Sequence, residues 1–434
     1  MKSDVHKVLH PIAGRPMLLH LLAATEALAP ERRVVVVGAG REQVEKAVAG
    51  AYGLGGIEIA VQAEQLGTGH AVLQAKEALH GFAGDVLILY GDVPLVRPET
   101  MKAMIDRLNK GDEPRAVVLG FRPDHPGAYG RVIADAQGLI VKMVEYKDAT
   151  AEERATTLCN SGLMAVHAAD LFVLLDSIGN ANAAGEYYLP DIVMLPGGTS
   201  AVIETDDPIE VSGVNSRIEL AALEGAWQER RREEAMRDGA TLTAPETIIF
   251  AHDTVLGRDV TVEPNVVFGP GVTVEDKAVI RAFSHLEGAI VRSAAIVGPY
   301  ARLRPGADVG EAAHVGNFVE IKNARLDRGA KANHLSYIGD ASVGAGANIG
   351  AGTITCNYDG FNKSRTEIGA GAFIGSNSAL VAPVRIGDGA IVGAGSTVTA
   401  DVSADALVLV RPPQVEKAGW AARFRDRMRA LKAK

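Results

Sequence analysis

The sequence predicts two folds in one chain: an α/β domain in the N-terminal half, followed by a parallel β-helix of hexapeptide repeats. Three observations support this prediction. Aliphatic residues recur at every sixth position near the C-terminus, strand-like and helix-like stretches alternate over residues 1–215, and a capped helix begins between the two regions. The length of 434 residues also exceeds one ordinary domain and suits two or three.

The repeat is clearest from Ile368 onward, where glycine often follows the aliphatic position. The aliphatic positions are Ile368, Ile374, Leu380, Ile386, Val392 and Val398. A period of six fits neither a helix nor an alternating strand, but it fits a coil of triangular cross-section with six residues per side. The inward aliphatics then stack from coil to coil, and the small residues beside them permit tight corners.

Weaker copies extend the β-helix toward the middle of the chain. They are Val260, Val266, Val272, Val309, Val315, Ile321, Val343 and Ile349. A polar segment, Thr355–Arg365, then interrupts the ladder. Insertions in solenoids usually lie on the binding face, so we expect this segment to border a site.

Residues 1–215 have a different rhythm, in which apolar strands alternate with amphipathic helices. Strands are expected at Val34–Val37, Val86–Tyr90 and Ala116–Gly120, and helices at Glu42–Ala49 and Thr100–Leu108. This alternation predicts a Rossmann-like α/β fold with a mostly parallel sheet.

A long helix is predicted between the two halves. Ser216 and Glu219 form the S-x-x-E pattern of a capping box, and Gly239 suits the C-terminal end. We therefore expect an N-terminal domain at residues 1–217, a linker helix at 218–238 and the β-helix at 239–434.

Composition narrows the class of protein. The hydrophobic content of 47% supports a packed core, and the net charge of −9 disfavours a nucleic-acid partner. The two cysteines, Cys159 and Cys356, lie far apart, which disfavours a disulfide scaffold or a zinc site. No apolar run approaches the ~20 residues of a membrane span and the N-terminus is polar, so we expect a cytoplasmic protein.

Two motifs in the N-terminal half suggest phosphate chemistry. Gln62–His70 is a glycine-rich loop leading into a helical pattern, and Tyr90-Gly-Asp92-Val-Pro94 follows an apolar strand. Ligands of α/β sheets bind at the carboxyl ends of the strands, and a carboxylate there can hold Mg²⁺. Each motif alone is a weak signal.

Together with further motifs in the same order, they resemble the sugar-phosphate nucleotidyltransferases. The further motifs are Lys7-Val-Leu-His10, Gly127-Ala-Tyr-Gly-Arg131, Val144-Glu-Tyr-Lys-Asp148, Asn160-Ser-Gly162, Gly185-Glu-Tyr-Tyr188 and Gly213-Val-Asn215. The whole chain is similar to the family of bifunctional enzymes that make UDP-N-acetylglucosamine. The resemblance implies that this half transfers UMP from UTP to N-acetylglucosamine 1-phosphate, with release of pyrophosphate and with Mg²⁺ as cofactor.

The same resemblance implies roles for individual residues. Lys7 is expected on the phosphates, and Asp92 and Asn215 on Mg²⁺. The nucleotide and the acetylated sugar are expected to contact Gln62, Gly67, Thr68, Tyr90, Gly91, Gly130, Glu145 and Asn160.

The β-helix carries a second set of motifs. Arg302–Gly306, His314–Lys322, His334–Asp340 and Asn348–Gly360 resemble, without a gap, the acetyltransferase site on the left-handed β-helix of the same family. His334 is the candidate general base, because the amine of glucosamine 1-phosphate must lose a proton to attack the thioester of acetyl-CoA and imidazole titrates near neutrality. Glu320 is expected to orient His334 or the ammonium group.

The remaining residues of this site are assigned by the resemblance. Those expected on the sugar phosphate are Arg304, Lys322, Tyr337, Asn348 and Lys363. Those expected on or beside acetyl-CoA are Ala351, Asn357, Tyr358, Ser376, Ala394 and Arg411. The family forms homotrimers with acetyl-CoA between subunits, so a trimer is expected. The basic segment Val415–Lys434 is either a solvated tail or a patch near the anionic acyl carrier.

One departure from the family leaves alternatives open. The family opens with a strand and a loop of the form L-A-A-G-x-G-T-R-M, whereas this sequence begins with residues that match the segment after that loop. We therefore expect an N-terminally truncated domain without its central strand. Either the start of the sequence is placed too late, or the domain has lost much of its uridylyltransferase activity; the main expectation is still the bifunctional enzyme. The alternatives are an acetyltransferase only, a non-enzymatic hexapeptide scaffold, and a different nucleotidyltransferase, such as a glucose 1-phosphate type.

Overall fold

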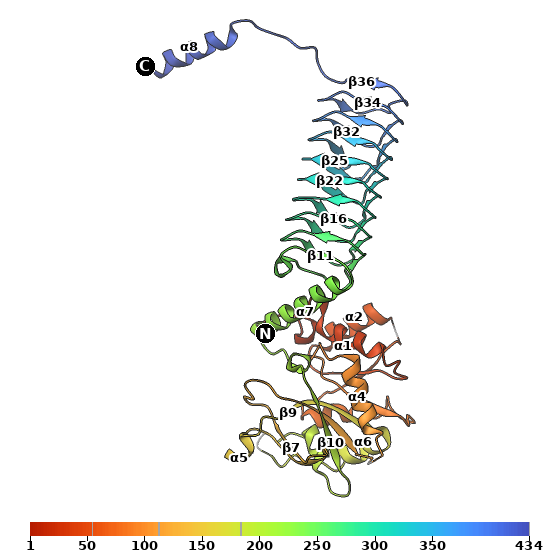
Figure 1. Cartoon of the computed structure of the whole chain (residues 1–434), viewed down its shortest axis with the longest axis vertical. Coiled ribbons are helices and arrows are strands. Elements are labelled where there is room, and N and C mark those ends of the chain that lie inside the picture. The colour runs from red at the N-terminus through yellow and green to blue at the C-terminus, as the bar shows by residue number, and fades with distance from the viewer. Residues whose placement is uncertain (54, 112, 183–184, 434) are drawn as a thin grey trace. The chain divides into compact units, whose positions relative to one another are not determined.

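The computed structural model describes residues 1–53, 55–111, 113–182 and 185–433. The chain divides into two compact units, Met1–Arg230 and Arg231–Lys434. The first is an α/β unit and the second is a β-helix (Figure 1).

The α/β unit contains a six-stranded sheet and a separate parallel pair among its described residues. The strands of the larger sheet are β5 (Asp85–Ile88), β6 (Ala116–Phe121), β7 (Arg131–Ala134), β8 (Ile140–Val144), β9 (Cys159–His167) and β10 (Ser200–Thr205). The separate pair is β3 (Val34–Val37) and β4 (Glu58–Val61), and a short hairpin joins β1 (Pro11–Ile12) to β2 (Arg15–Pro16).

The prediction of a mostly parallel sheet was wrong. Within the larger sheet β10 runs parallel to β6, but β9 pairs antiparallel with both β5 and β6. The strand β7 also pairs antiparallel with β8 and β9. The alternation of strands and helices along the chain does not specify direction, because β9 enters between strands that precede it in sequence.

Helices cover both faces of this sheet. The helices described in this unit are α1 (Met17–Glu26), α2 (Arg41–Tyr52), α3 (Thr68–Leu73), α4 (Pro98–Leu108), α5 (Ala151–Arg154) and α6 (Ala168–Leu175), with 3-10 turns η1 (Lys7–Leu9), η2 (Leu189–Met194) and η3 (Pro208–Val211). Met101 and Met104 of α4 pack with Val117 of β6, whereas Leu171 of α6 packs with Val118. All of β6 is buried for this reason, as expected for a strand covered on two faces.

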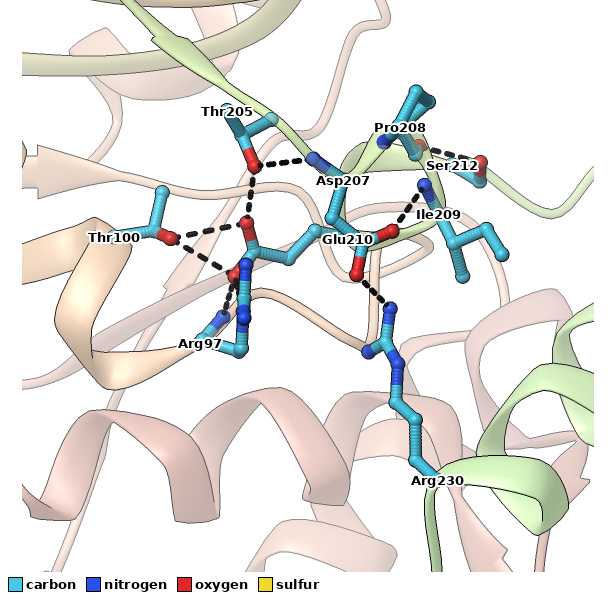
Figure 2. A network of polar contacts seen from close by, with 9 residues as sticks. All are labelled: Arg97, Thr100, Thr205, Asp207, Pro208, Ile209, Glu210, Ser212 and Arg230. Carbon is cyan, nitrogen blue, oxygen red and sulfur yellow. Dashed lines mark hydrogen bonds and ion pairs between the residues drawn. The ribbon is translucent and has the colours of Figure 1, made fainter. Parts of the chain in front are cut away.

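A buried carboxylate fastens η3 to α4. Glu210 is fully buried and accepts hydrogen bonds from Arg97 Nε at 2.6 Å, Thr100 Oγ1 at 2.9 Å and Thr205 Oγ1 at 2.7 Å (Figure 2). Burial acts to raise the pKa of this carboxyl, but the hydrogen bonds from Arg97, Thr205 and Thr100 outweigh it and lower the pKa below its usual range. The network fixes the chain just before Asn215.

The predicted helix between the halves is α7 (Arg217–Arg237). Its capping box is formed as expected, with Ser216 N donating to Glu219 Oε2 at 2.7 Å and Glu219 N to Ser216 Oγ at 3.2 Å. The helix ends before Gly239, which has a φ of 101°.

The β-helix consists of three parallel sheets, one for each side of the coil. The ten-stranded side holds β11 (Thr241–Leu242), β13 (Thr261–Val262), β16 (Val279–Ile280), β19 (Ile296–Val297), β22 (His314–Asn317), β25 (Lys331–His334), β28 (Asn348–Ile349), β31 (Phe373–Ile374), β34 (Ile391–Val392) and β36 (Leu407–Val408). The side that follows it along each coil holds β14 (Val267–Phe268), β17 (His285–Leu286), β20 (Arg302–Leu303), β23 (Glu320–Lys322), β26 (Tyr337–Gly339), β29 (Ile354–Cys356), β32 (Ala379–Val381) and β35 (Thr397–Val398).

The third side completes each coil. It holds β12 (Val255–Leu256), β15 (Thr273–Val274), β18 (Ala289–Val291), β21 (Ala307–Val309), β24 (Arg325–Leu326), β27 (Ala341–Val343), β30 (Thr366–Ile368) and β33 (Val384–Ile386). The coils stack directly on one another in Figure 1.

The aliphatic ladder is confirmed. All the predicted positions from Val260 to Val398 are buried. The interruption is also confirmed, because the polar segment leaves the coil between β29 and β30. The basic C-terminal segment forms α8 (Trp420–Lys432), in which no described residue is buried. Over the described ranges, no helix combines the length and the apolar character needed to cross a bilayer.

Candidate functional site

Three predicted residues from distant parts of the α/β unit converge on one point. Lys7 Nζ lies 2.6 Å from Asp92 Oδ2 and donates to Asn215 Oδ1 at 3.0 Å. Lys7 begins η1, Asp92 follows β5, and Asn215 precedes α7. A carboxylate oxygen and an amide oxygen therefore face one cation.

The backbone fixes these two oxygens relative to each other. Val214 N donates to the carbonyl of Asp92 at 2.9 Å, and Asn215 N donates to Glu219 Oε2 at 2.7 Å. Glu219 was assigned only a capping role from sequence, but it also anchors Asn215. This second role follows from its place in the first turn of α7, where backbone N–H groups are free.

The glycine-rich loop is held by the segment that precedes η2. Gly67 has a φ of 108°, and a side chain there would meet the carbonyl oxygen of Tyr187 at 2.6 Å. Thr68 Oγ1 accepts a hydrogen bond from Leu189 N at 3.0 Å, and Gln62 Nε2 donates to the carbonyl of Gly67 at 3.1 Å. Gln62, Gly67 and Thr68 thus form one structured loop, as expected, and Tyr187 was missed as its partner.

The residues assigned to the sugar also lie together. Asn160 N donates to the carbonyl of Gly130 at 2.9 Å, and a side chain on Gly130 would approach Glu145 Oε1 to 3.3 Å. Burial, followed by the charges of Asp191 and Asp148, raises the pKa of Glu145. Asp191 was not identified from sequence because only the fold brings η2 beside Glu145.

Tyr90 lies between the sugar group and the cation site. Burial raises the pKa of its hydroxyl to about 12, although a hydrogen bond with Thr68 lowers it, and the charges of Asp92 and Glu145 add smaller increases. The tyrosine therefore stays neutral. Gly162 is required beside it, because a side chain there would meet the Tyr90 ring at 2.4 Å. Gly91 packs near Val8 and Leu18, where a side chain would still fit at 3.4 Å.

A cavity of about 920 Å³ connects this site to the interior of the unit. Its lining includes Lys7, Gln62, Thr68, Tyr90, Gly91 and Asp92, together with apolar residues of β3 and β5. These two strands do not pair, so the cavity separates the β3–β4 pair from the larger sheet.

In the β-helix, His334 lies at the end of β25, on a corner of the coil. Its Nδ1 lies 2.6 Å from Oδ1 of Asn317, which occupies the same position one coil earlier. A carbonyl oxygen can only accept, so this contact requires the proton on Nδ1 and leaves the lone pair on Nε2. Glu320 Oε1 accepts from Arg304 at 2.7 Å, and the described contact of the His334 ring is with Asn317, which sequence reasoning missed.

Cations gather on the next side of the coil, at the edge far from the His334 corner. Lys322 ends β23 and Arg304 follows β20. The pKa of Lys322 is lowered, first by the charge of Lys363 and further by that of Arg304. Like charges so close repel each other unless an anion lies between them, so this edge suits a phosphate.

The polar segment Thr355–Arg365 brings Lys363 to that edge. Asn323 Nδ2 donates to Asp340 Oδ1 at 2.6 Å, and Asn357 Nδ2 donates to the other carboxylate oxygen. Tyr358 and Lys363 pair across the loop. Asn357 therefore anchors the loop through Asp340, a contact that sequence reasoning missed.

Tyr337 and Asn348 lie on different sides of the coil. Tyr337 begins β26, in register with Glu320 on the side that carries the cations. Asn348 begins β28, on the ten-stranded side that also carries His334. The corner at His334 separates these two sides.

Four of the residues assigned to acetyl-CoA, Ala351, Ser376, Ala394 and Arg411, form a column that continues from His334, whereas Asn357 and Tyr358 lie in the polar loop. Gly352 N donates to the carbonyl of His334 at 3.3 Å, and Asn377 N donates to that of Ala351 at 2.7 Å. The next coils add Ser376, whose carbonyl accepts from Gly395 N at 2.8 Å, and Ala394, whose carbonyl accepts from Arg411 at 2.5 Å. Small residues keep this corner open.

The two units therefore define a nucleotidyltransferase domain joined to a hexapeptide-repeat transferase. Residues 1–148 match the MobA-like NTP transferase domain, and residues 365–400 match the bacterial transferase hexapeptide model of six repeats.

Three relatives each align with the whole chain and with 95% of their own length. They are the bifunctional GlmU proteins of Rhizorhabdus wittichii, Novosphingobium aromaticivorans and Sphingopyxis alaskensis, at 67%, 66% and 63% identity. The chain belongs to the family of bifunctional GlmU proteins. It is a bifunctional transferase with acetyltransferase and uridylyltransferase activities, which removes the non-enzymatic scaffold and the glucose 1-phosphate enzyme as alternatives.

Proposed function

We propose that His334 is the general base that prepares the amine of glucosamine 1-phosphate for acetyl transfer. The main support is the 2.6 Å contact of its Nδ1 with Asn317 Oδ1, which leaves Nε2 as the proton acceptor. The amine nitrogen attacks the thioester carbonyl of acetyl-CoA and loses its proton to Nε2. The carbon–sulfur bond then breaks, and the coenzyme leaves as a thiol after taking a proton.

The two substrates would bind on either side of this base. The cations would hold one of them, and the small residues along the His334 corner would hold the other. Arg304, Lys322 and Lys363 bind the sugar phosphate, and Tyr337 and Asn348 contact the sugar. Ala351, Ser376, Ala394 and Arg411 line the acetyl-CoA site, with Asn357 and Tyr358 beside it. Asn317 is a positioning residue, because it acts through His334.

In the α/β unit, Asp92 and Asn215 would hold Mg²⁺. Their fit rests on the two oxygens that converge on a cation, since Mg²⁺ binds through one or two protein oxygens and completes its shell with water and phosphate. Mg²⁺ supplies charge neutralisation at the triphosphate. Lys7 contacts the phosphates, the Gln62–Thr68 loop holds the uracil end, and Gly130, Glu145 and Asn160 position the sugar whose phosphate attacks the α-phosphorus of UTP.

A homotrimer is supported by an exposed apolar ridge on the β-helix, which we define as Phe283, Tyr300, Phe318 and Leu335. These residues occupy one corner of successive coils, and each has a φ between 53° and 59°. Phe283 stacks on Tyr300, and Tyr300 stacks on Phe318, at 5.0 and 5.2 Å. Positive φ is costly for bulky residues, and exposed apolar patches mark interfaces.

The ridge adjoins the acetyltransferase site, because Phe318 and Leu335 directly follow Asn317 and His334. A second copy on the ridge would therefore cover the base. Tyr300→Ser/Phe318→Ser should lower the mass measured by light scattering, while Phe361→Ser, a change at an exposed aromatic outside the ridge, should not. A trimer that survives the double change would contradict this assignment.

We also propose domain limits at 1–217, 218–238 and 239–434 and a cytoplasmic location. The limits are supported by α7, which spans the join. The paucity of cysteines suits a reducing compartment.

The test of the acetyltransferase site is thiol release from acetyl-CoA in His334→Gln. Loss of a general base should lower kcat by about 10²- to 10⁴-fold. His285→Gln, on an adjoining side of the coil and outside the site, should stay near the unchanged protein. Activity retained in His334→Gln would show that His334 is not the general base.

A second candidate function, acetyl transfer without uridylyl transfer, is favoured by one observation. The 920 Å³ cavity interrupts the sheet that carries Asp92, and a site on an interrupted sheet is less well preorganised. Pyrophosphate release from UTP and N-acetylglucosamine 1-phosphate separates the two candidates.

A further inference from the structure

The ammonium of Lys7 occupies the position between the two oxygens that are proposed to hold Mg²⁺. It lies 2.6 Å from Asp92 Oδ2 and 3.0 Å from Asn215 Oδ1. The side chains of Lys7 and Asp92 are 37% and 23% exposed, so both reach the solvent-accessible cavity. Lys7 is thus accessible rather than locked in a core.

The backbones of Asp92 and Asn215 are held in place by contacts that do not involve Lys7. The backbone bond from Val214 N to the Asp92 carbonyl joins the two segments directly. Glu219 holds the backbone of Asn215 from the other side. The two oxygens form a binding position (a seat) for a cation, and the ammonium of Lys7 occupies it.

An ammonium and a divalent cation cannot share this seat. Mg²⁺ binds oxygen at about 2.0–2.1 Å, so both cations would need the same two oxygens and would repel each other at a separation of a few ångströms. Metal binding must therefore expel the ammonium of Lys7. Lys7 is also the residue assigned to the phosphates, which offer the expelled charge a new partner.

We propose that Lys7 is a placeholder cation, whose ammonium neutralises Asp92 in the free protein and must leave the seat before the metal enters. This inference rests on the proposed metal site. Its consequence is an order of binding: metal alone binds weakly, because it competes with Lys7. A nucleoside triphosphate favours metal entry, because its phosphates draw Lys7 away and bring negative charge to the seat.

The test is binding of Mn²⁺, as a spectroscopic substitute for Mg²⁺, to the full chain without nucleotide. Free Mn²⁺ is counted by its electron paramagnetic resonance signal. Lys7→Met should bind Mn²⁺ about tenfold tighter or more at one site, since removing one like charge near a divalent cation is worth at least that factor. Lys76→Met is the matched control, because Lys76 pairs with Asp176 and touches neither Asp92 nor Asn215.

Two outcomes separate this inference from the proposed metal site. Equal or weaker Mn²⁺ binding in Lys7→Met, with binding still lost in Asp92→Asn, would overturn the placeholder and keep the site. Binding that is unchanged in Asp92→Asn and in Lys7→Met/Asp92→Asn would overturn the site itself. The near-ultraviolet circular dichroism of each variant checks that the α/β unit is folded.

Discussion

The two units build their sites in opposite ways. In the β-helix, residues that act together lie one coil apart, as do Asn317 and His334 at a sequence separation of 17. In the α/β unit, Lys7 meets Asp92 and Asn215 at separations of 85 and 208. The first arrangement rests on continuous ladders of ten, eight and eight strands, and the second on a sheet interrupted by a cavity. A repeat therefore positions a site locally, whereas the α/β unit does so only once it is wholly folded.

The largest expected effect comes from breaking the long-range site. Asp92→Asn should lower uridylyl transfer by about 10²- to 10³-fold, because a weakened metal seat loses several kcal/mol of charge stabilisation. Acetyl transfer should be unchanged, since it depends on the other unit. The assay is pyrophosphate release beside thiol release, with Asp176→Asn as the surface control. Loss of both activities in Asp92→Asn would contradict the claim that each unit builds its own site.

A smaller effect is expected from removing a cation at the edge of the β-helix that carries Arg304, Lys322 and Lys363. Lys322→Ala should raise the KM for glucosamine 1-phosphate about ten- to a hundredfold, because charge-assisted hydrogen bonds to phosphate are strong. Lys331→Ala, an exposed change on the ten-stranded side, is the control. An unchanged KM in Lys322→Ala would show that the sugar phosphate does not bind at this edge.

The same lysine predicts a pH dependence. Its pKa is lowered from 10.5 by Lys363 and then Arg304, and only the protonated form attracts phosphate. Affinity for the sugar phosphate should therefore be present at neutral pH and weaken as the pH rises through the lowered pKa. KM measured across alkaline pH in the unchanged protein and in Lys363→Ala tests this, because the variant should hold its affinity to higher pH.

Stability of the α/β unit should depend on the carboxylate of Glu210. Glu210→Gln leaves buried donors without their charged partner and should cost about 2–3 kcal/mol in the free energy of unfolding. Glu204→Gln is the control, because its ion pair with Arg122 is exposed and worth less than about 1 kcal/mol. Chemical denaturation followed by circular dichroism gives both values, and equal costs would contradict the role of the network.

The lowered pKa of Glu210 fixes the sign of its acid dependence. A depressed folded pKa means that the stabilisation is fully present above the ordinary value of 4.5 and is lost as the pH falls through the folded pKa. Glu210→Gln should remove this component of acid sensitivity. An unchanged acid transition in the variant would show that other carboxylates dominate it.

The smallest expected effect is the difference in unfolding free energy when one methylene is removed from a buried isoleucine in each unit. Ile321→Val lies in the closed ladder, whereas Ile88→Val faces the cavity. The first should cost about 1 kcal/mol, and the second less, because part of the Ile88 side chain borders the cavity. Calorimetric unfolding of both variants measures the difference, and a larger cost at Ile88 would mean that the cavity is filled in solution.

The sequence was most informative where structure repeats. The period from Ile368 to Val398 gave the coil and its buried positions. The same period could have identified Asn317, since His334 lies one coil further on. By contrast, the direction of β9 and the meeting of Lys7 with Asn215 arise from strand order, which local patterns do not encode.

The most direct test of the central claim, that two reactions operate from two separate sites, uses the unchanged 434-residue chain. Pyrophosphate release from UTP, Mg²⁺ and N-acetylglucosamine 1-phosphate is measured beside thiol release from acetyl-CoA and glucosamine 1-phosphate. The account predicts that both are well above background. Thiol release with background pyrophosphate release would contradict it and leave an acetyltransferase whose interrupted α/β sheet no longer supports nucleotide chemistry.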